Sequence, residues 1–422
     1  MCPVETLACG HAALTGSRRV CRHLLAEEPP TYVGLLTGVG VDYDAACESC
    51  ADDPGRELLR LCEGCVERAT AFYDMTGWRG TPEVRVRDRP AGGRWAELSF
   101  SLAPRNGQCV ASVDDGWAML ADERLILFDG SGSVVADHGL SIAPEPPSDW
   151  VGRVRCPALH ASVDGRFAVV VTDYGRFGQV VDLSTGGHTL VLDRGDYHNY
   201  VTPFPVCFVG TWPDTVVVAA TAWNRLDAFD AATGRLLTAR ETGRRTRGQP
   251  IPDTYLDYFH GRLLANPSGR RIVDDGWVWH PAGIPTVIDV AAWLAGRVYA
   301  PENGRRLAQR NYAWDQPMAW LDDRTVAIQR IGPDDELMLD GVQRFDVETG
   351  RVTTAFAGPS GRMWAYRGRL YVGADNGTEI WDPASGSRIA LLEGFKPIAQ
   401  SPHTGTLVEA NRGALRTWTP TD

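Results

Sequence analysis

The sequence predicts a mostly β protein, in which a small N-terminal α+β module precedes a propeller of about seven four-stranded antiparallel blades. Seven of the ten cysteines fall within the first 65 residues, which marks a separate small module. From about residue 83, short strand-like runs replace helical periodicity, and a strand–Asp–turn–Gly–strand unit recurs. We therefore assign residues 1–75 to the module, 76–82 to a linker and 83–422 to the propeller.

The N-terminal module contains two Cys-x-x-Cys pairs, Cys47/Cys50 and Cys62/Cys65. Zinc prefers four thiolate or imidazole ligands in a tetrahedron, and this spacing lets two cysteines reach one ion from a single turn. The two pairs together predict a closed four-thiolate zinc site, with disulfides or free thiols as the alternatives. A closed shell leaves no open position for a substrate, so the expected zinc is structural. A redox pair would need a thioredoxin-like βαβ context, which the sequence lacks.

A second set of candidate metal ligands lies upstream, in the two Cys-x-His units formed by Cys9, His11, Cys21 and His23. On the two strands of a hairpin, such alternating residues would point to the same side. The sequence therefore predicts one or two zinc ions. In the alternative arrangement only some of these residues are ligands, for example Cys9 and Cys21 sharing an ion with one later pair.

The last element of the module is predicted to be a helix from Pro54 to Asp74. Proline suits the first turn of a helix, and apolar residues recur at helical spacing from Leu58 onward. This helix would carry the Cys62/Cys65 pair on one face.

Five units of the propeller share an apolar strand, an aspartate, a tight turn that ends in glycine, and a second strand. The aspartate can accept hydrogen bonds from backbone amides two or three residues later, and the glycine takes the positive φ that closes the hairpin. Another pair of strands precedes most of the units, so each period holds about four antiparallel strands, as in a propeller blade. The five aspartates are Asp129, Asp182, Asp230, Asp346 and Asp382.

Counting these periods gives seven blades, with six or eight as alternatives. The fourth blade departs from the pattern, with a longer turn and a short helix. The last blade has room for only three strands, and a strand from 83–102, either EVRVRD or RWAELSFSL, would complete it and close the ring. The approximate limits are 108–138, 158–193, 203–241, 257–300, 312–357, 362–393 and from 397 onward.

Both parts of the chain resemble known families. The D-x-x-[TS]-G turns of the propeller are similar to those of WD40-like, YVTN-like and PQQ-like repeats, a resemblance that implies the architecture and little about function. The cysteine module resembles bacterial zinc-ribbon or treble-clef domains. That resemblance implies a zinc ion that stabilises the fold.

The net charge of -11 argues against nucleic acid as a partner, because an acidic chain gains no affinity from releasing the counterions of a phosphate backbone. The longest apolar runs have strand length, so no membrane span or signal peptide is predicted. The expected location is the cytoplasm, a reducing compartment in which clustered cysteines more often bind metals than form disulfides.

The sequence favours an intracellular binding or scaffold protein over an enzyme. Fourteen tryptophans are generous for this length, and aromatic residues in exposed loops favour contact with a protein or peptide partner. The alternative is a hydrolase or lyase with its active site in the central channel of the propeller. Its candidate catalytic residues are His198, Asp257, His260, Asp275, His280 and Asp315.

Overall fold

The computed structural model divides the chain into two compact units, Met1–Glu83 with Ile331–Pro333, and Val84–Arg330 with Asp334–Asp422. Each unit is described by itself. The structure describes residues 19–25, 32–36, 43–51, 53, 55–60, 84–99, 108–145, 153–211, 213–243, 249–250, 252, 254–279, 281–332, 334–335, 338–411 and 413–421.

The described part of the N-terminal unit is a four-stranded sheet with the order β2-β3-β1-β4. A 3-10 helix follows β1 and a short α-helix follows β3, so each of these strands leads directly into a turn of helix. The elements are β1 (Arg19–Cys21), η1 (Arg22–Leu25), β2 (Tyr32–Leu36), β3 (Tyr43–Cys47), α1 (Glu48–Ala51) and β4 (Leu58–Arg60).

The helix predicted from Pro54 to Asp74 is wrong at its start, because Leu58–Arg60 form strand β4, which pairs antiparallel with β1. Leu59 is only 3% exposed and packs in a small core with Val20 and Leu24. Pairing with β1 and burial of this side chain outweigh the local helical periodicity. Residues 61–83 lie outside the described residues.

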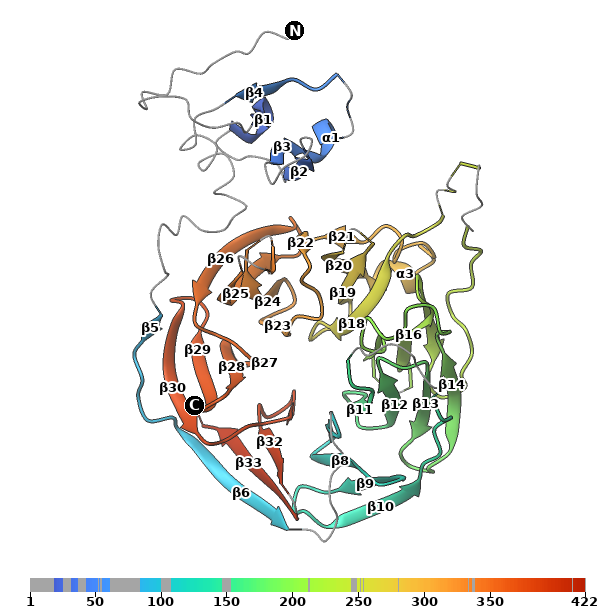
Figure 1. The fold of residues 1–422 in the computed structure, drawn as a ribbon. Coiled ribbons are helices and arrows are strands. Elements are labelled where there is room, and N and C mark those ends of the chain that lie inside the picture. Colours follow the sequence, from blue (N-terminus) through green and yellow to red (C-terminus); the bar gives the residue numbers. More distant parts are fainter. Residues whose placement is uncertain are drawn as a thin grey trace. The chain divides into compact units, whose positions relative to one another are not determined.

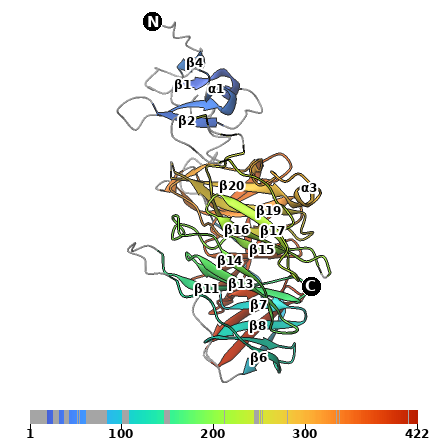
Figure 2. The ribbon, with the colours of Figure 1, turned by 90° about the vertical axis from the view of Figure 1, so that its right-hand side faces the viewer.

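The second unit is a propeller, and the described residues form its seven predicted blades (Figure 1). Inner strands such as β11, β18, β23 and β27 lie near the centre of the ring, and outer strands such as β10, β14, β26 and β30 lie at its rim. Viewed from the side, blades 4, 3, 2 and 1 follow one another from β20 to β8 (Figure 2). Blade 1 comprises β7 (Val110–Val113), β8 (Gly116–Ala121), β9 (Arg124–Phe128) and β10 (Val134–Gly139). Blade 2 comprises β11 (Cys156–Ala161), β12 (Phe167–Asp173), β13 (Phe177–Asp182) and β14 (His188–Asp193). Blade 3 comprises β15 (Val206–Val209), β16 (Val216–Ala222) and β17 (Arg225–Asp230).

Blades 4 to 7 include the irregular fourth blade and the two that recruit strands from the start of the unit. Blade 4 comprises β18 (Phe259–Ala265), β19 (Arg271–Val278), β20 (Ala282–Asp289), α3 (Val290–Leu294), β21 (Arg305–Arg306) and β22 (Arg310–Asn311), and blade 5 comprises β23 (Met318–Trp320), β24 (Thr325–Ile331), β25 (Leu339–Asp346) and β26 (Arg351–Ala357). Blade 6 comprises β27 (Arg362–Tyr366), β28 (Arg369–Ala374), β29 (Gly377–Asp382), β30 (Ser387–Glu393) and β5 (Arg85–Val86). Blade 7 comprises β31 (Ala399–Gln400), β32 (Leu407–Asn411), β33 (Ala414–Pro420) and β6 (Gly93–Ser99).

The ring closes as the RWAELSFSL alternative predicts. Strand β6 pairs antiparallel with β33 along its whole length, from Gly93 opposite Pro420 to Ser99 opposite Ala414. The other alternative, EVRVRD, contributes β5, which adds a fifth, parallel strand at the edge of blade 6. Both segments therefore cover sheet edges, which removes sites for unwanted strand pairing.

The aspartates of the repeat make the hairpin contacts that the sequence predicts. Asp182 Oδ1 accepts from the Ser184 amide at 2.9 Å, and Asp346 Oδ1 accepts from the Glu348 amide at 2.9 Å and the Thr349 amide at 3.1 Å. The turn glycines have φ between 64° and 85°, a range that side chains with a Cβ rarely adopt. These glycines are Gly132, Gly186, Gly234, Gly350 and Gly386.

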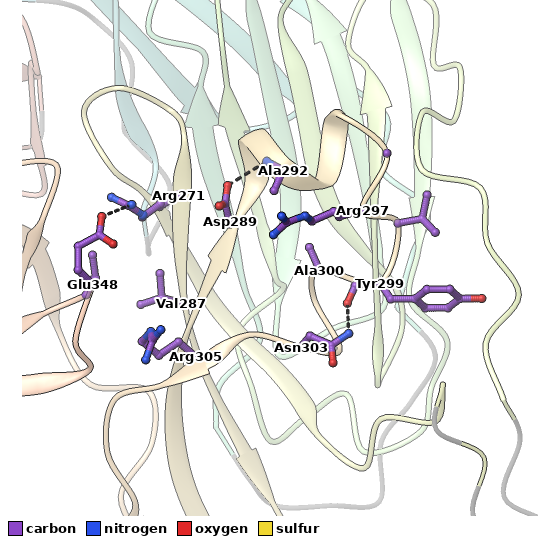
Figure 3. A pocket seen from close by; sticks show the side chains of 13 residues that line it. Arg271, Val287, Asp289, Ala292, Arg297, Tyr299, Ala300, Asn303, Arg305 and Glu348 are labelled. Carbon is purple, nitrogen blue, oxygen red and sulfur yellow. Dashed lines mark hydrogen bonds and ion pairs between the residues drawn. The ribbon is translucent and has the colours of Figure 1, made fainter. Parts of the chain in front are cut away.

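Blade 4 departs from the repeat, as predicted, and contains the short helix α3. Its third and fourth strands are joined by residues 290–304 in place of a tight turn, so its fourth strand, β21, lies beyond the predicted limit of 300. Asp289 caps α3 by accepting from the Ala292 amide at 2.9 Å. The inserted segment forms one wall of a cavity (Figure 3).

The apolar core lies between neighbouring blades. Trp293, Val218 and Leu263, for example, belong to one buried cluster that joins blades 3 and 4. Since most blades are covered on both faces, their inner strands are nearly continuous apolar runs, such as VVVAATA in β16. Among the described residues, no helix has the length and apolar character needed to cross a membrane.

Candidate functional sites

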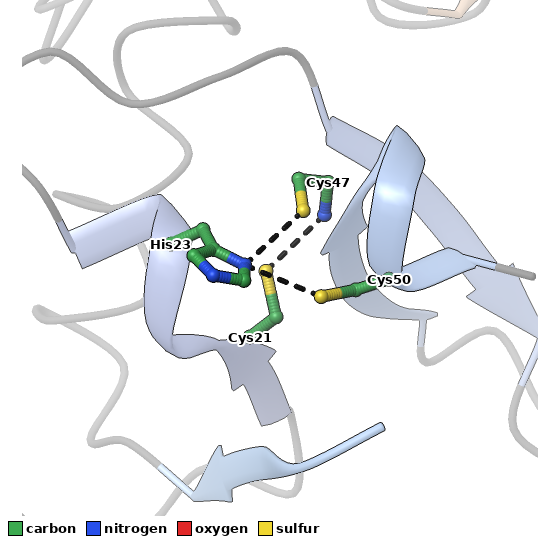
Figure 4. Close-up of side chains that lie close together, drawn as sticks. All are labelled: Cys21, His23, Cys47 and Cys50. Atoms are coloured by element: carbon green, nitrogen blue, oxygen red, sulfur yellow. Dashed lines mark hydrogen bonds between the residues drawn. The ribbon is translucent and has the colours of Figure 1, made fainter. Parts of the chain in front are cut away.

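Four side chains of the N-terminal unit form a candidate metal centre: Cys21, His23, Cys47 and Cys50 (Figure 4). Their potential ligand atoms all lie within 4.8 Å of one another. The His23 Nδ1 atom is 3.4 Å from Cys47 Sγ and 3.2 Å from Cys50 Sγ. In a tetrahedral zinc site with typical bond lengths, such nitrogen and sulfur atoms are separated by about 3.5 Å. The donor set and its spacing therefore fit a zinc ion.

Two strand ends position these ligands. Cys21 ends β1 and His23 lies in η1, while Cys47 ends β3 and Cys50 lies in α1. The parallel pairing of Val20 with Ala45 places the two strand ends side by side. His23 thus lies in a helical turn, not on the strand of the predicted Cys-x-His hairpin.

The thiols of this cluster influence one another's ionisation. Burial raises the pKa of Cys47, but hydrogen bonds with Ser49 and Cys50 outweigh this effect and lower it to about 6. The hydrogen bond with Cys47 raises the pKa of Cys50 to about 11, and burial and the negative charge of Cys47 act in the same direction. One thiolate in this cluster therefore disfavours ionisation of the next thiol, and a bound cation would relieve the repulsion between the two negative charges.

The structure joins half of each predicted ligand set. Cys47 and Cys50 come from the predicted four-cysteine site, whereas Cys21 and His23 come from the second set. The other predicted ligands lie outside the described residues, so their role as ligands stays a prediction. These are Cys9, His11, Cys62 and Cys65.

The strand order of the propeller decides which loops share a face. Because successive strands are antiparallel, the turns between second and third strands open on the same face as the loops that connect one blade to the next. We call this the loop face. The Asp–Gly hairpins lie on the opposite face.

Aromatic side chains from several blades stack on the loop face. Phe259 is stacked between Tyr197 and Trp277, with ring centroids 5.9 and 4.5 Å away, and Trp314 is stacked on Trp277 at 5.2 Å. Two of these side chains are about half exposed, Tyr197 at 50% and Trp279 at 49%. We call this group the aromatic surface, and it comprises Tyr197, His198, Trp223, Phe259, Trp277, Trp279 and Trp314.

A polar bridge lies on the same face. The Asp315 carboxylate accepts hydrogen bonds from the Tyr174 hydroxyl and the Arg153 guanidinium, and its other oxygen lies 3.4 Å from Arg262. Burial raises the pKa of Tyr174, and the negative charge of Asp315 adds to this effect. Tyr174 and Asp315 have φ values of 59° and 55°, and backbone strain of this kind is concentrated at functional sites.

The structure separates the predicted catalytic residues into different environments. His198 belongs to the aromatic surface, where its Nδ1 lies 2.7 Å from the Tyr200 hydroxyl and burial lowers its pKa. Asp315 belongs to the polar bridge, and Asp257 is exposed. His280 lies outside the described residues.

The remaining two candidates are buried. His260 is 2% exposed, and its Nδ1 lies 2.6 Å from Asp274, which the sequence did not distinguish as a partner. Burial raises the pKa of Asp275 to about 7, although its Oδ2 accepts from the Gln316 amide at 2.5 Å. Nothing in the sequence pairs Asp274 with His260, which the pairing of β18 with β19 brings together, or pairs Arg153 and Tyr174 with Asp315, which the closed ring brings together.

Comparisons with known proteins give no family. No protein-family model matches the sequence, and no curated protein matches it. A chain from a structure described as "Crystal Structure of Mitotic Checkpoint Complex" is similar in fold, with a TM-score of 0.49 and 11% sequence identity over 82% of this chain and 96% of that chain. This likeness says nothing about function.

Proposed function

We propose that the protein is an intracellular binding or scaffold module, in which the aromatic surface of the propeller takes a protein or peptide partner and a structural zinc ion holds the N-terminal module. The observation that carries the proposal is the half-exposed state of Tyr197 and Trp279. Large, rigid aromatic side chains contribute much of the binding energy at protein interfaces and lose little conformational entropy on binding.

The surroundings of this surface favour a partner with basic side chains. Asp196 precedes Tyr197, Asp257 lies two residues before Phe259, and both aspartates are exposed. A cationic side chain above an indole or phenol ring gains from the negative face of the ring, and a nearby carboxylate adds to the attraction.

Zinc suits the N-terminal module for two reasons. Three thiolates and an imidazole form a common ligand set for structural zinc. The described core of the unit consists of six buried side chains, too few to stabilise a small fold without a cross-link or metal. The free cysteines among the described residues also suit a reducing compartment such as the cytoplasm.

The experiment compares partner capture by the intact protein with capture by a double variant, Tyr197→Ser with Trp279→Ser. The control is Val135→Ser with Val191→Ser, which alters apolar residues that are even more exposed, on outer strands β10 and β14. Binding of the recovered, purified partner is then measured directly. We expect the aromatic variant to weaken binding by about tenfold or more, as for hot-spot residues, and the control to leave it unchanged.

Two results would contradict the proposal. If no partner is recovered under gentle conditions, a scaffold function is untenable. If the aromatic variant binds normally while a chain without residues 1–83 does not, the N-terminal module, not the propeller, recruits the partner.

The second candidate function, a hydrolase or lyase, has one specific observation in its favour. Asp274 orients His260, and the buried His260 Nε2 has no hydrogen-bond partner among the described residues. This arrangement would suit a general base. The adjacent cavity of about 10 Å³, however, has room for no more than one water molecule. If His260→Gln abolishes a turnover without lowering thermal stability, the enzyme hypothesis gains over the scaffold.

A further inference from the structure

The cavity beside α3 lies in blade 4, at the point where this blade departs from the repeat of the other blades. Five other blades join their third and fourth strands by tight Asp–Gly or similar short turns, whereas blade 4 uses residues 290–304. Long insertions on a rigid scaffold commonly carry binding functions. Residues of the insertion, of β19–β21 and of the neighbouring hairpin in blade 5 together line an open cavity of about 550 Å³. This volume lies in the range of small-molecule sites.

The cavity has an apolar part. Val287 from β20 and Val347 from the blade 5 hairpin line it, and they are 6% and 3% exposed. Ala292 and Ala300 of the inserted segment also contribute to the lining. These side chains could contact the apolar body of a ligand.

The polar part of the lining has an excess of positive charge. Glu348 pairs with Arg271, and Asp289 is engaged as the cap of α3 (Figure 3). Arg297 and Arg305 are exposed, and among the described residues their guanidinium groups have neither an ion pair nor a hydrogen bond. Two unpaired guanidinium groups beside one cavity are notable in a chain whose net charge is -11.

We infer that this cavity binds a small organic anion, with Arg297 and Arg305 holding its carboxylate or phosphate group and the valine and alanine side chains contacting its apolar body. Guanidinium groups match the geometry of both anions and form strong, charge-assisted hydrogen bonds with them. The site lies on the hairpin face of the propeller, so the inference does not depend on the aromatic surface or its partner.

Calorimetric titration of the full chain with phenyl phosphate tests the inference, with inorganic phosphate and benzyl alcohol as the two half-ligands. We expect phenyl phosphate to bind more tightly than either, with a Kd of about 1 mM or lower and an affinity that falls as salt is added. Arg297→Gln and Arg305→Gln should each weaken it by about tenfold or more, the effect expected for a lost hydrogen bond to a charged group.

Arg306→Gln is the matched control, because Arg306 is the next residue of the same short strand, is exposed and does not line the cavity. Ala292→Phe is a charge-neutral variant that narrows the cavity, and it should weaken binding while the thermal midpoint is retained. The site is overturned if Arg306→Gln loses as much affinity for phenyl phosphate as the two cavity variants, or if Ala292→Phe binds it fully. It is also overturned if the original protein does not bind phenyl phosphate at about 10 mM. Equal binding of benzyl alcohol would overturn the anionic specificity, and equal binding of inorganic phosphate would overturn the role of the apolar lining.

Discussion

The Tyr174 hydroxyl donates a hydrogen bond to the Asp315 carboxylate across 141 residues of sequence, between a turn of blade 2 and the loop that enters blade 5. These blades are not neighbours, so the contact ties together parts of the ring that share no strand pairing. The side chain of Asp315 is only 6% exposed. Its carboxylate oxygens are therefore largely shielded from water and accept hydrogen bonds from protein donors instead.

Tyr174→Phe should destabilise the propeller, because it removes one donor from a nearly buried carboxylate. We expect a loss of about 1–3 kcal/mol in the free energy of unfolding, measured by urea titration. Tyr312→Phe is the control, since Tyr312 lies on the loop that carries Asp315 and is 63% exposed. Equal stability of the two variants would show that the bridge contributes nothing.

The buried carboxyl of Asp275 should make the propeller less stable as the pH rises. Burial holds its folded-state pKa at about 7, above its unfolded value near 4, so the folded protein binds the extra proton between these limits. The stabilisation from this bound proton is fully present below pH 4 and is lost as the pH rises to 7. It amounts to about 1.4 kcal/mol for each unit by which the folded-state pKa exceeds the unfolded-state pKa.

Asp275→Asn removes this titration. The original protein should lose thermal stability between pH 5 and pH 8. The variant should lose less over the same range, because it has no carboxyl group at this position. Parallel melting curves for the two proteins across this range would argue that Asp275 stays ionised.

Metal content should follow the cluster that the structure brings together. Cys21→Ser and Cys47→Ser should each remove one equivalent of zinc, measured by elemental analysis, because a thiolate ligand is lost. Cys109→Ser, which changes a buried cysteine of blade 1, should leave the metal content unchanged. Loss of the same equivalent in Cys62→Ser, with retention in Cys21→Ser, would instead support the set formed by Cys47, Cys50, Cys62 and Cys65.

The hairpin aspartate of blade 5 should stabilise the fold only when it is ionised. Burial raises the pKa of Asp346, but its hydrogen bonds with Arg324 and with the turn amides outweigh this effect and lower it. Its contribution is therefore present above pH 4 and is lost as the pH falls through the lowered folded-state value. Asp346→Ala should cost about 1–2 kcal/mol at pH 7 and less at pH 3. Glu123→Ala, at an exposed site in a turn of blade 1, should show no such difference.

Local chemistry made most of the propeller predictable. An aspartate and a glycine within five residues favour a hairpin locally, so five blades could be predicted from short stretches such as QRFDVETGRVTTA. The spacing between these stretches then predicted seven blades, with six and eight as alternatives, and an irregular fourth blade. That a strand from 83–102 completes the last blade was also predictable, because that blade lacks one strand, but the sequence did not decide between EVRVRD and RWAELSFSL.

Contacts between distant residues were not predictable in this way. Four cysteines at regular spacing form a plausible ligand set on their own, yet the parallel pairing of Val20 with Ala45 brings Cys21 and His23 to Cys47 and Cys50. Strand β4 similarly owes its conformation to pairing with β1. The enzyme candidates were selected as residue types near strand ends, and the side chains that engage them, such as Asp274, became apparent only with the register of β18 against β19.

The pairing of β6 with β33 also sets a waiting time during synthesis. Strand β6 leaves the ribosome before its partner, Ala414–Pro420, which follows about 300 residues later. At about 5–20 residues per second, the edge of β6 stays uncovered for roughly 15–60 s. Each nascent chain therefore passes through a long interval in which blade 7 cannot form, and a chaperone or a neighbouring chain on the same messenger RNA has time to bind the open strand.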